Sequence, residues 1–383
     1  MNEDRASRYH RLKRRVSVAS VAWSVSILSM MVLSGASQWL RDFSQTLAAA
    51  MGFQTPTAAV LLYLAGLTAL HEAGSLALGY YGSYQLERRY GMSTQTPRQW
   101  LADQAKSLGV AFVLGAAAVS LIYWTIRVAP SLWWLLSGAL FALFLGVLAN
   151  LAPVVLVPLF YTIKPLSKES LRRRLLALAD RAGARVLGAY EWGLGSKTRK
   201  ANAALTGLGS TRRILVSDTM LADYSDDEIE VVLAHELAHH VHGDIWKGLV
   251  FESMLVLAGF FLAARLLSVL AAPLGLAAVS DVAGLPILLL SAGLVSVIML
   301  PVAHAMSRSH ERRADRFALE LTRNPQAFIS AMRRLGAQNL AEERPSKIVQ
   351  WLFYSHPPLS ERIAAAKGAG DESRTASVRG PGL

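Results

Sequence analysis

Two histidines and a glutamate stand within five residues of one another in the segment His235-Glu236-Leu237-Ala238-His239. On an α-helix, side chains four residues apart project from the same face, so both imidazoles could reach one metal ion. Glu236 could then contact a water molecule beside that ion and accept its proton. The spacing predicts two metal ligands and a general base on one helix. An ordinary helix with two surface histidines is the alternative.

A histidine pair of this kind, with a glutamate beside the first histidine, is typical of zinc metalloproteases. A hydrolytic zinc site needs a third protein ligand and an open coordination position. The 383 residues include no cysteine, so this ligand must be a histidine or a carboxylate. Glu311 is our candidate, and Asp315, on the same helical face, is expected to orient a zinc-bound histidine. Spacing alone also allows a salt-bridged helix, because Arg308 and Arg312 are near.

Two further segments could contribute to catalysis or to substrate binding. His356 stands before two prolines, which favour an extended backbone, and could donate a hydrogen bond to a developing oxyanion. A histidine in such a turn is more often a plain surface residue. Arg362, a few residues later, is expected to anchor the local fold. The strand around Asn202 and Ala203 could pair with the backbone of an extended substrate.

The composition indicates an integral membrane protein. Hydrophobic residues make up 53% of the chain and only 17% of residues are charged, whereas about a quarter are charged in a typical soluble protein. Crossing a bilayer takes about 20 apolar residues in a helix. Six blocks are long enough: 16–35, 57–80, 107–127, 132–157, 247–270 and 285–306. Residues 38–55 are too polar for a span and are expected along the interface.

The net charge of +12 could indicate nucleic acid binding, but the basic residues flank the apolar blocks. Their alternation between successive loops follows the positive-inside rule, so nucleic acid is excluded as a partner and the lipid bilayer is expected instead. The same alternation predicts a multi-pass protein of the cell membrane. Both termini and the histidine pair are expected in the cytosol.

The longest polar stretch reads as a small α+β domain. We expect a helix from Ser167 to Ala182, strands at 185–192, 202–206 and 213–217, and a capping box at Ser225 before the histidine helix. The predicted fold is therefore a mainly α multi-pass membrane protein with a small α+β, zincin-like cytosolic zinc domain. Its predicted parts are a membrane domain of about four spans at 1–160, a zinc-binding segment at 161–245, two spans at 246–306, the rest of the zinc domain at 307–367, and a disordered tail at 368–383.

The motifs, in this order, resemble the integral-membrane CAAX prenyl endopeptidases, a family of zinc metallopeptidases. Similar segments are Leu86-Glu87-Arg88-Arg89-Tyr90-Gly91, Ser196-Lys197-Thr198-Arg199-Lys200-Ala201-Asn202-Ala203, the histidine helix, and Ser307-Arg308 through Glu311 to Ala314-Asp315. The resemblance covers roughly residues 80–365. Residues before 57 are the part that does not match, and six spans are counted here against seven in eukaryotic members.

The resemblance implies that His235, His239 and Glu311 hold the zinc and that Glu236 is the general base. It also implies a large intramembrane chamber. Ionisable groups within the spans, such as His71 and Glu72, would line that chamber or form a satisfied structural pair. The residues that follow the histidine pair, 240–244, are closer to the related heat-shock membrane metalloproteases.

The predicted activity is hydrolysis of peptide bonds at the cytosolic face by an enzyme with one Zn²⁺ per chain. The expected substrates are peptides or proteins, including membrane-associated or lipidated ones. One alternative with the same chemistry is quality-control cleavage of membrane proteins by a heat-shock-type enzyme. A zinc-stabilised scaffold or transporter is the non-enzymatic alternative, although a purely structural zinc site has no need for a base beside its first ligand.

Overall fold

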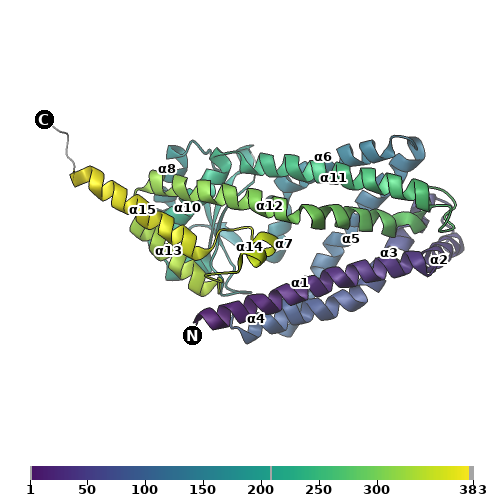
Figure 1. Cartoon of the computed structure of the whole chain (residues 1–383), viewed down its shortest axis with the longest axis horizontal. Helices are drawn as coiled ribbons and strands as arrows, with labels where there is room; N and C mark the ends of the chain where they lie inside the picture. The colour runs from purple at the N-terminus through teal and green to yellow at the C-terminus, as the bar shows by residue number, and fades with distance from the viewer. Residues whose placement is uncertain (1, 208, 379–383) are drawn as a thin grey trace.

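Residues 2–207 and 209–378 are described by a computed structural model, in which long helices run side by side along one axis (Figure 1). Among these described residues, six helical segments are long and apolar enough to cross a membrane, as the sequence predicts. The six long helices are α1 (Asn2–Leu33), α3 (Pro56–Gly79), α5 (Pro97–Val128), α6 (Trp133–Leu151), α11 (Asp244–Leu270) and α12 (Leu285–Thr322).

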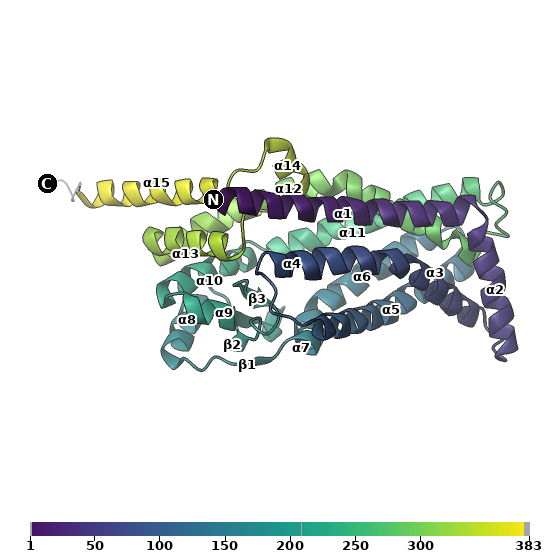
Figure 2. The ribbon, with the colours of Figure 1, turned by 90° about the horizontal axis from the view of Figure 1, so that it is seen from below.

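The other α-helices complete the ends of these spans and the domain beyond them. They are α2 (Ala36–Ala50), α4 (Leu86–Arg89), α7 (Val157–Phe160), α8 (Glu169–Arg181), α9 (Asp218–Asp223), α10 (Asp226–Val241), α13 (Pro325–Gln338), α14 (Lys347–Phe353) and α15 (Leu359–Val378). Figure 2 shows α2 lying across the long helices at one end of the bundle, while α8, α10, α13 and the sheet lie at the other. Helix α2 is not among the candidate spans.

The sheet has the strand order β1-β2-β4-β3 and is mixed. Strand β1 (Ile163–Pro165) is antiparallel to β2 (Ala189–Trp192), β2 is parallel to β4 (Arg213–Ser217), and β4 is antiparallel to β3 (Ala203–Thr206). Two of the three predicted strands therefore form as expected, whereas the regular part of the first begins only after Gly188. Strand β3 lies at the edge of the sheet, beside α10.

Helix α10 is the centre of this domain, and its start is fixed by the predicted capping box. The Ser225 hydroxyl accepts from the Glu228 N–H, and the Glu228 carboxylate accepts from the Ser225 N–H at 2.8 Å. Leu233 and Leu237 are fully buried in a core that also contains Phe328 from α13. Burying each such side chain contributes about 1.5–3 kcal/mol, so the histidine helix is held firmly in place.

The expected start of α8 is wrong. The helix begins at Glu169, Lys168 is its N-cap residue, and Ser167 makes no cap. The N–H of Leu166 donates to the Ala189 carbonyl, which continues the β1–β2 ladder past the end of β1. This hydrogen bond keeps the chain extended at the position where the sequence suggested a helix cap.

Helix α12 continues without a break from the sixth span into the domain that contains the sheet. Its 38 residues extend about 57 Å at 1.5 Å per residue, well beyond the roughly 30 Å of a bilayer core. The predicted boundary at 306/307 therefore falls inside one helix. The tail also differs from the expectation of disorder at 368–383, because α15 extends to Val378, and the remaining residues lie outside the described part. Ile363 and Ala366 pack α15 against the core, which gives this helix a stable start.

Glu87 joins three distant segments beside the domain that contains the sheet. Its buried carboxylate accepts from the Tyr9 hydroxyl at 2.6 Å and pairs with Lys13 at 2.7 Å, both on α1. It also lies 3.1 Å from Lys200, in the loop that precedes β3. The membrane helix α1 is thereby connected to the strand that borders the candidate site.

Close packing of α1 on α3 gives a test of this arrangement. A Cβ at Gly74 would lie 2.4 Å from the Trp23 ring, which is held by a hydrogen bond from its N–H to the His71 carbonyl. We expect Gly74→Ala to lower the thermal unfolding midpoint, since overpacking costs about 1–3 kcal/mol. Gly79→Ala on the same helix is the control, because its nearest neighbour would lie 4.0 Å away. Equal midpoints for the two variants would contradict the packing.

Candidate metal centre

His235 and His239 lie beside Glu311, although α11 and the membrane-spanning part of α12 separate them in sequence. One ligand atom from each residue lies within 4.8 Å of the others. The Nε2 atom of His235 is 3.2 Å from Glu311 Oε2, and the Nε2 atom of His239 is 3.4 Å from Glu311 Oε1. Ligand atoms around a tetrahedral zinc, with bonds of about 2.0–2.2 Å, are themselves about 3.3–3.5 Å apart.

The Glu311 carboxylate supplies an independent test of whether a metal fits. Its Oε2 atom is buried and has no hydrogen-bond partner in the described part of the chain. A buried carboxylate oxygen is costly without a partner, and a cation between it and the two imidazoles would satisfy it. Two imidazole nitrogens with one carboxylate oxygen are a donor set that zinc uses in hydrolytic sites. The three residues therefore fit a divalent metal.

Each ligand histidine is oriented through its other ring nitrogen. Asp315 lies 2.9 Å from His235 Nδ1 and receives two hydrogen bonds from Arg362, of 2.8 and 2.6 Å. This agrees with the roles that the sequence suggested for Asp315 and Arg362. A carboxylate on Nδ1 leaves Nε2 with its lone pair toward the metal position.

Asp244 orients His239 as Asp315 orients His235. The sequence did not predict this role of Asp244. Its Oδ2 atom lies 3.1 Å from His239 Nδ1, and Arg313 hydrogen-bonds its other oxygen. Asp244 is the first residue of α11, directly after Gly243, whose φ of 66° turns the chain. The signal in the sequence was an aspartate five residues after the second histidine, preceded by a glycine.

His356 and the edge of β3 border the same cavity, of about 360 Å³, as do His235, Glu236 and Glu311. The Nε2 atom of His356 lies 3.4 Å from Glu311 Oε1, and 60% of the side chain is exposed. The structure thus brings together every site residue that the sequence suggested: Asn202, Ala203, His235, Glu236, His239, Glu311, Asp315, His356 and Arg362.

Asn339 identifies which part of the β3 edge is free. Its side-chain amide exchanges two hydrogen bonds with the backbone of Ala201, as a neighbouring strand would. Because backbone groups alternate in direction along a strand, the N–H and C=O of Ala203 also point to this edge, away from β4. Ala203 is thus the next residue that an extended chain could pair with. The sequence did not predict the Asn339 contact.

The predicted intramembrane chamber remains a prediction, but the alternative for His71 has direct support. The His71 ring lies 2.9 Å from the Ser24 hydroxyl and 3.3 Å from the Glu72 carboxylate. These contacts satisfy both ring nitrogens, as a structural pair would.

Comparisons with known proteins agree with this geometry. Residues 165–369 match peptidase family M48, which is more than half of the chain. The chain belongs to peptidase family M48. Residues 2–162 match the family described as CAAX prenyl protease N-terminal, five membrane helices. The expectation that the resemblance excludes residues before 57 is therefore wrong.

Two relatives and one solved structure extend the M48 assignment over most of the chain. The uncharacterized metalloprotease YhfN of Bacillus subtilis is 30% identical, over 94% of this chain and 84% of its own. CAAX prenyl protease 1 of Saccharomyces cerevisiae is 28% identical, over 80% and 71% respectively. The crystal structure of S. mikatae Ste24p has the same fold, with a TM-score of 0.84 at 24% identity over 95% of this chain and 88% of that one.

This M48 chain is thus a multi-pass membrane metalloprotease, and its family implies a metal, typically zinc. A scaffold or transporter without catalytic activity does not agree with a peptidase family. In the region described as having five membrane helices, the structure has four candidate spans and the crosswise helix α2.

Electrostatics at this M48 site favour a bound cation. Burial lowers the pKa of the His235 imidazole, but its contacts with Asp315 and Glu311 outweigh burial and raise it to about 9. Without a metal, His235 therefore carries a proton at neutral pH. Burial also raises the pKa of the Glu236 carboxyl. A carboxyl with a raised pKa is better suited to exchange protons near neutral pH.

Metal binding to the metal-free protein should release protons. Because an imidazole must be neutral to bind a metal, the proton on His235 has to leave below about pH 9, and apparent zinc affinity should rise with pH until that value is reached. Isothermal titration calorimetry in buffers of different ionisation enthalpy counts the released protons. Zinc binding at neutral pH without proton release would contradict the contacts of His235.

Asp244→Ala should weaken zinc binding about 10- to 100-fold, the usual effect of removing a partner that orients a metal-bound histidine. Asp227→Ala is the matched control, because the Asp227 side chain is exposed on the first turn of α10 and pairs with Arg174 at 2.6 Å. Competition with a chromogenic chelator measures both affinities. Equal zinc affinity in the two variants would exclude a positioning role for Asp244.

Proposed function

We propose that this M48 protein is a zinc-dependent endopeptidase with one Zn²⁺ per chain, acting at the cytosolic face of the cell membrane. The observation that carries the proposal is the cluster of His235, His239 and Glu311 beside Glu236 in one cavity. When bound there, zinc supplies a Lewis acid that polarises a carbonyl and lowers the pKa of a water molecule. The roles below belong to the chain's own side chains.

Glu236 is proposed as the general base and later the general acid. It follows the first ligand directly, so its carboxylate lines the cavity beside the metal position. Its raised pKa supports both halves of the reaction, in which the carboxylate takes a proton from the attacking water and passes it to the leaving amine. His356, exposed in the same cavity, would donate a hydrogen bond to the oxyanion of the tetrahedral intermediate.

The free edge of β3 is proposed to hold the substrate. An extended peptide that pairs with the backbone of Ala203 would lie along the cavity that contains Glu236 and His356. The side chain of the adjacent Asn202 is exposed and could contact the same peptide. Main-chain pairing of this kind fixes the position of the scissile bond and does not depend on the amino-acid sequence of the substrate.

We expect Glu236→Gln to lower the rate of peptide cleavage by about 10²–10⁴-fold, the usual contribution of general acid–base catalysis. The variant should keep its zinc, because the three ligands are unchanged. Glu230→Gln on the same helix is the control, since Glu230 forms surface ion pairs with Arg174 and Arg181. Peptidase assays with metal analysis by mass spectrometry test both statements, and full activity of Glu236→Gln would refute the assignment of the base.

The proposed substrates are peptides or proteins at the membrane, including lipidated ones. Support comes from relatives named CAAX prenyl protease 1, from yeast to mouse, and from the membrane helices that surround the site. Quality-control cleavage of membrane proteins is the second candidate, because residues 240–244 resemble the heat-shock metalloproteases. Cleavage of a prenylated peptide, its unprenylated twin and an unfolded membrane protein would separate the two.

The proposed orientation places both termini and the metal site in the cytosol, which rests on the distribution of Lys and Arg. Because the chain has no cysteine, a single introduced cysteine is the only thiol that a maleimide can label, and its labelling reports the side of the membrane on which it lies. In right-side-out vesicles, a membrane-impermeant maleimide should label Ser280→Cys, in the α11–α12 loop, and spare Ser196→Cys, in the metal-binding domain. Both residues are exposed. The reverse labelling pattern would overturn the orientation.

A further inference from the structure

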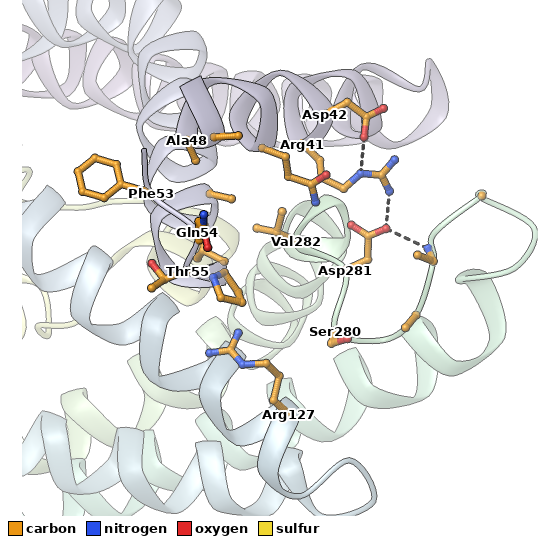
Figure 3. Close-up of a pocket in the computed structure, with 18 residues that line it drawn as sticks. Arg41, Asp42, Ala48, Phe53, Gln54, Thr55, Arg127, Ser280, Asp281 and Val282 are labelled. Carbon is orange, nitrogen blue, oxygen red and sulfur yellow. Dashed lines mark hydrogen bonds and ion pairs between the residues drawn. The ribbon is translucent and has the colours of Figure 1, made fainter. Parts of the chain in front are cut away.

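A second cavity, of about 730 Å³, is shown in Figure 3. It lies beside α2, and Figure 2 shows α2 at the opposite end of the bundle from α10, the helix that carries His235 and His239. The cavity is lined by α2, the turn between α2 and α3, the last turn of α5 and the loop between α11 and α12. Cavities of this size commonly hold small organic ligands. None of its residues takes part in the metal site.

Arg127 is the unpartnered charge in this cavity. Its guanidinium points into the space (Figure 3), and in the described part of the chain no carboxylate lies within ion-pair distance of it. Arg41, by contrast, is paired with Asp42 at 2.8 Å and with Asp281 at 2.5 Å. Asp281 in turn accepts backbone N–H groups of the loop, including that of Ala277 at 2.9 Å. Arg127 is therefore free to bind an anionic group.

The first turn of α3 opens into the same cavity and adds a second feature that favours an anion. Thr55 is the N-cap residue of α3, and its hydroxyl makes no capping hydrogen bond. The N-terminus of a helix carries a partial positive charge, which favours a nearby anion, although Pro56 has no N–H here and the N–H of Ala58 already donates to the Thr55 carbonyl at 3.1 Å. Arg127 and Thr55 thus offer a charge and a free hydroxyl to one phosphate.

The surroundings of the cavity indicate that this phosphate belongs to a lipid. Helix α2 lies across the bundle, and its Trp39 and Phe43 rings stack at 5.6 Å with 67% and 50% exposure. Phe53, which is 53% exposed, lies at the cavity itself. Exposed aromatic residues on a crosswise amphipathic helix are typical of the level of lipid headgroups. A soluble phosphate ester would make no contact with these exposed aromatic side chains, whereas the acyl chains of a lipid would.

The charge balance selects the kind of headgroup. Two arginines and two aspartates line the cavity, so its formal charge is zero, and the Asp42 side chain is 63% exposed. We propose that this cavity binds the headgroup of a zwitterionic phospholipid that carries a primary ammonium, with the phosphate at Arg127 and Thr55 and the ammonium at Asp42. A headgroup with a net negative charge would be attracted by Arg127 but repelled by Asp42 and Asp281.

Native mass spectrometry of the full-length protein in detergent tests this proposal. Titration with phosphatidylethanolamine should show one retained lipid at lower concentration than titration with phosphatidylcholine or phosphatidylglycerol of the same acyl chains. Arg127→Gln should weaken that binding about tenfold or more, because it removes a charge-assisted hydrogen bond. Thr55→Val should weaken it less, and Asp42→Asn should abolish the preference over phosphatidylcholine.

Arg265→Gln is the matched control, since Arg265 lies in the last two turns of α11 and packs over the Phe261 ring outside the cavity. It should bind phosphatidylethanolamine as the parent does. Equal binding of the three lipids, or unchanged binding by both Arg127→Gln and Thr55→Val, would overturn the proposal. Free phosphoethanolamine that binds as tightly as the intact lipid would show a soluble ligand instead and would overturn the lipid assignment.

Discussion

The contact between one buried carboxylate and two imidazoles, made across two helices, is the constraint on which the rest of this structure depends. Glu311 on α12 meets His235 and His239 on α10, and a shared cation would satisfy its buried Oε2 atom. Because α11 and half of α12 form the intervening hairpin of spans, the depth of that hairpin sets the position of Glu311. The membrane helices are thereby part of the geometry of the metal site.

Two aspartate–arginine pairs make this contact specific. Asp315 with Arg362 fixes the ring of His235, and Asp244 with Arg313 fixes that of His239. Asp244 and Arg313 come from α11 and α12, so the two spans that deliver Glu311 also orient a histidine. Catalytic metal sites gain affinity and precision from such partners.

Local sequence signals predicted the parts of the site that depend on spacing along one helix. The histidine pair, Glu236 and the capping box at Ser225 need only a 3.6-residue period, and the spans need only apolar length. Strand and helix starts were less accurate, because Leu166 and Gly188 are governed by pairing within the sheet. Glu311 was a candidate from chemistry, and its role followed only from the resemblance.

Contacts between distant segments could not be read from the sequence. The side-chain amide of Asn339 hydrogen-bonds the backbone of Ala201 as a neighbouring strand would. No pattern in the sequence around Asn339 predicts this contact. The cavity that contains Arg127 likewise combines three segments that are far apart in the chain. Such features depend on how the spans pack, which hydrophobic length alone does not determine.

Anomalous X-ray diffraction at the zinc edge, from crystals of the zinc-loaded protein, tests the shared cation most directly. The structure predicts one strong peak per chain, about 2.0–2.2 Å from His235 Nε2, His239 Nε2 and one Glu311 oxygen. A peak coordinated by other residues, or one bound by the two histidines with the Glu311 carboxylate beyond bonding distance, would contradict it.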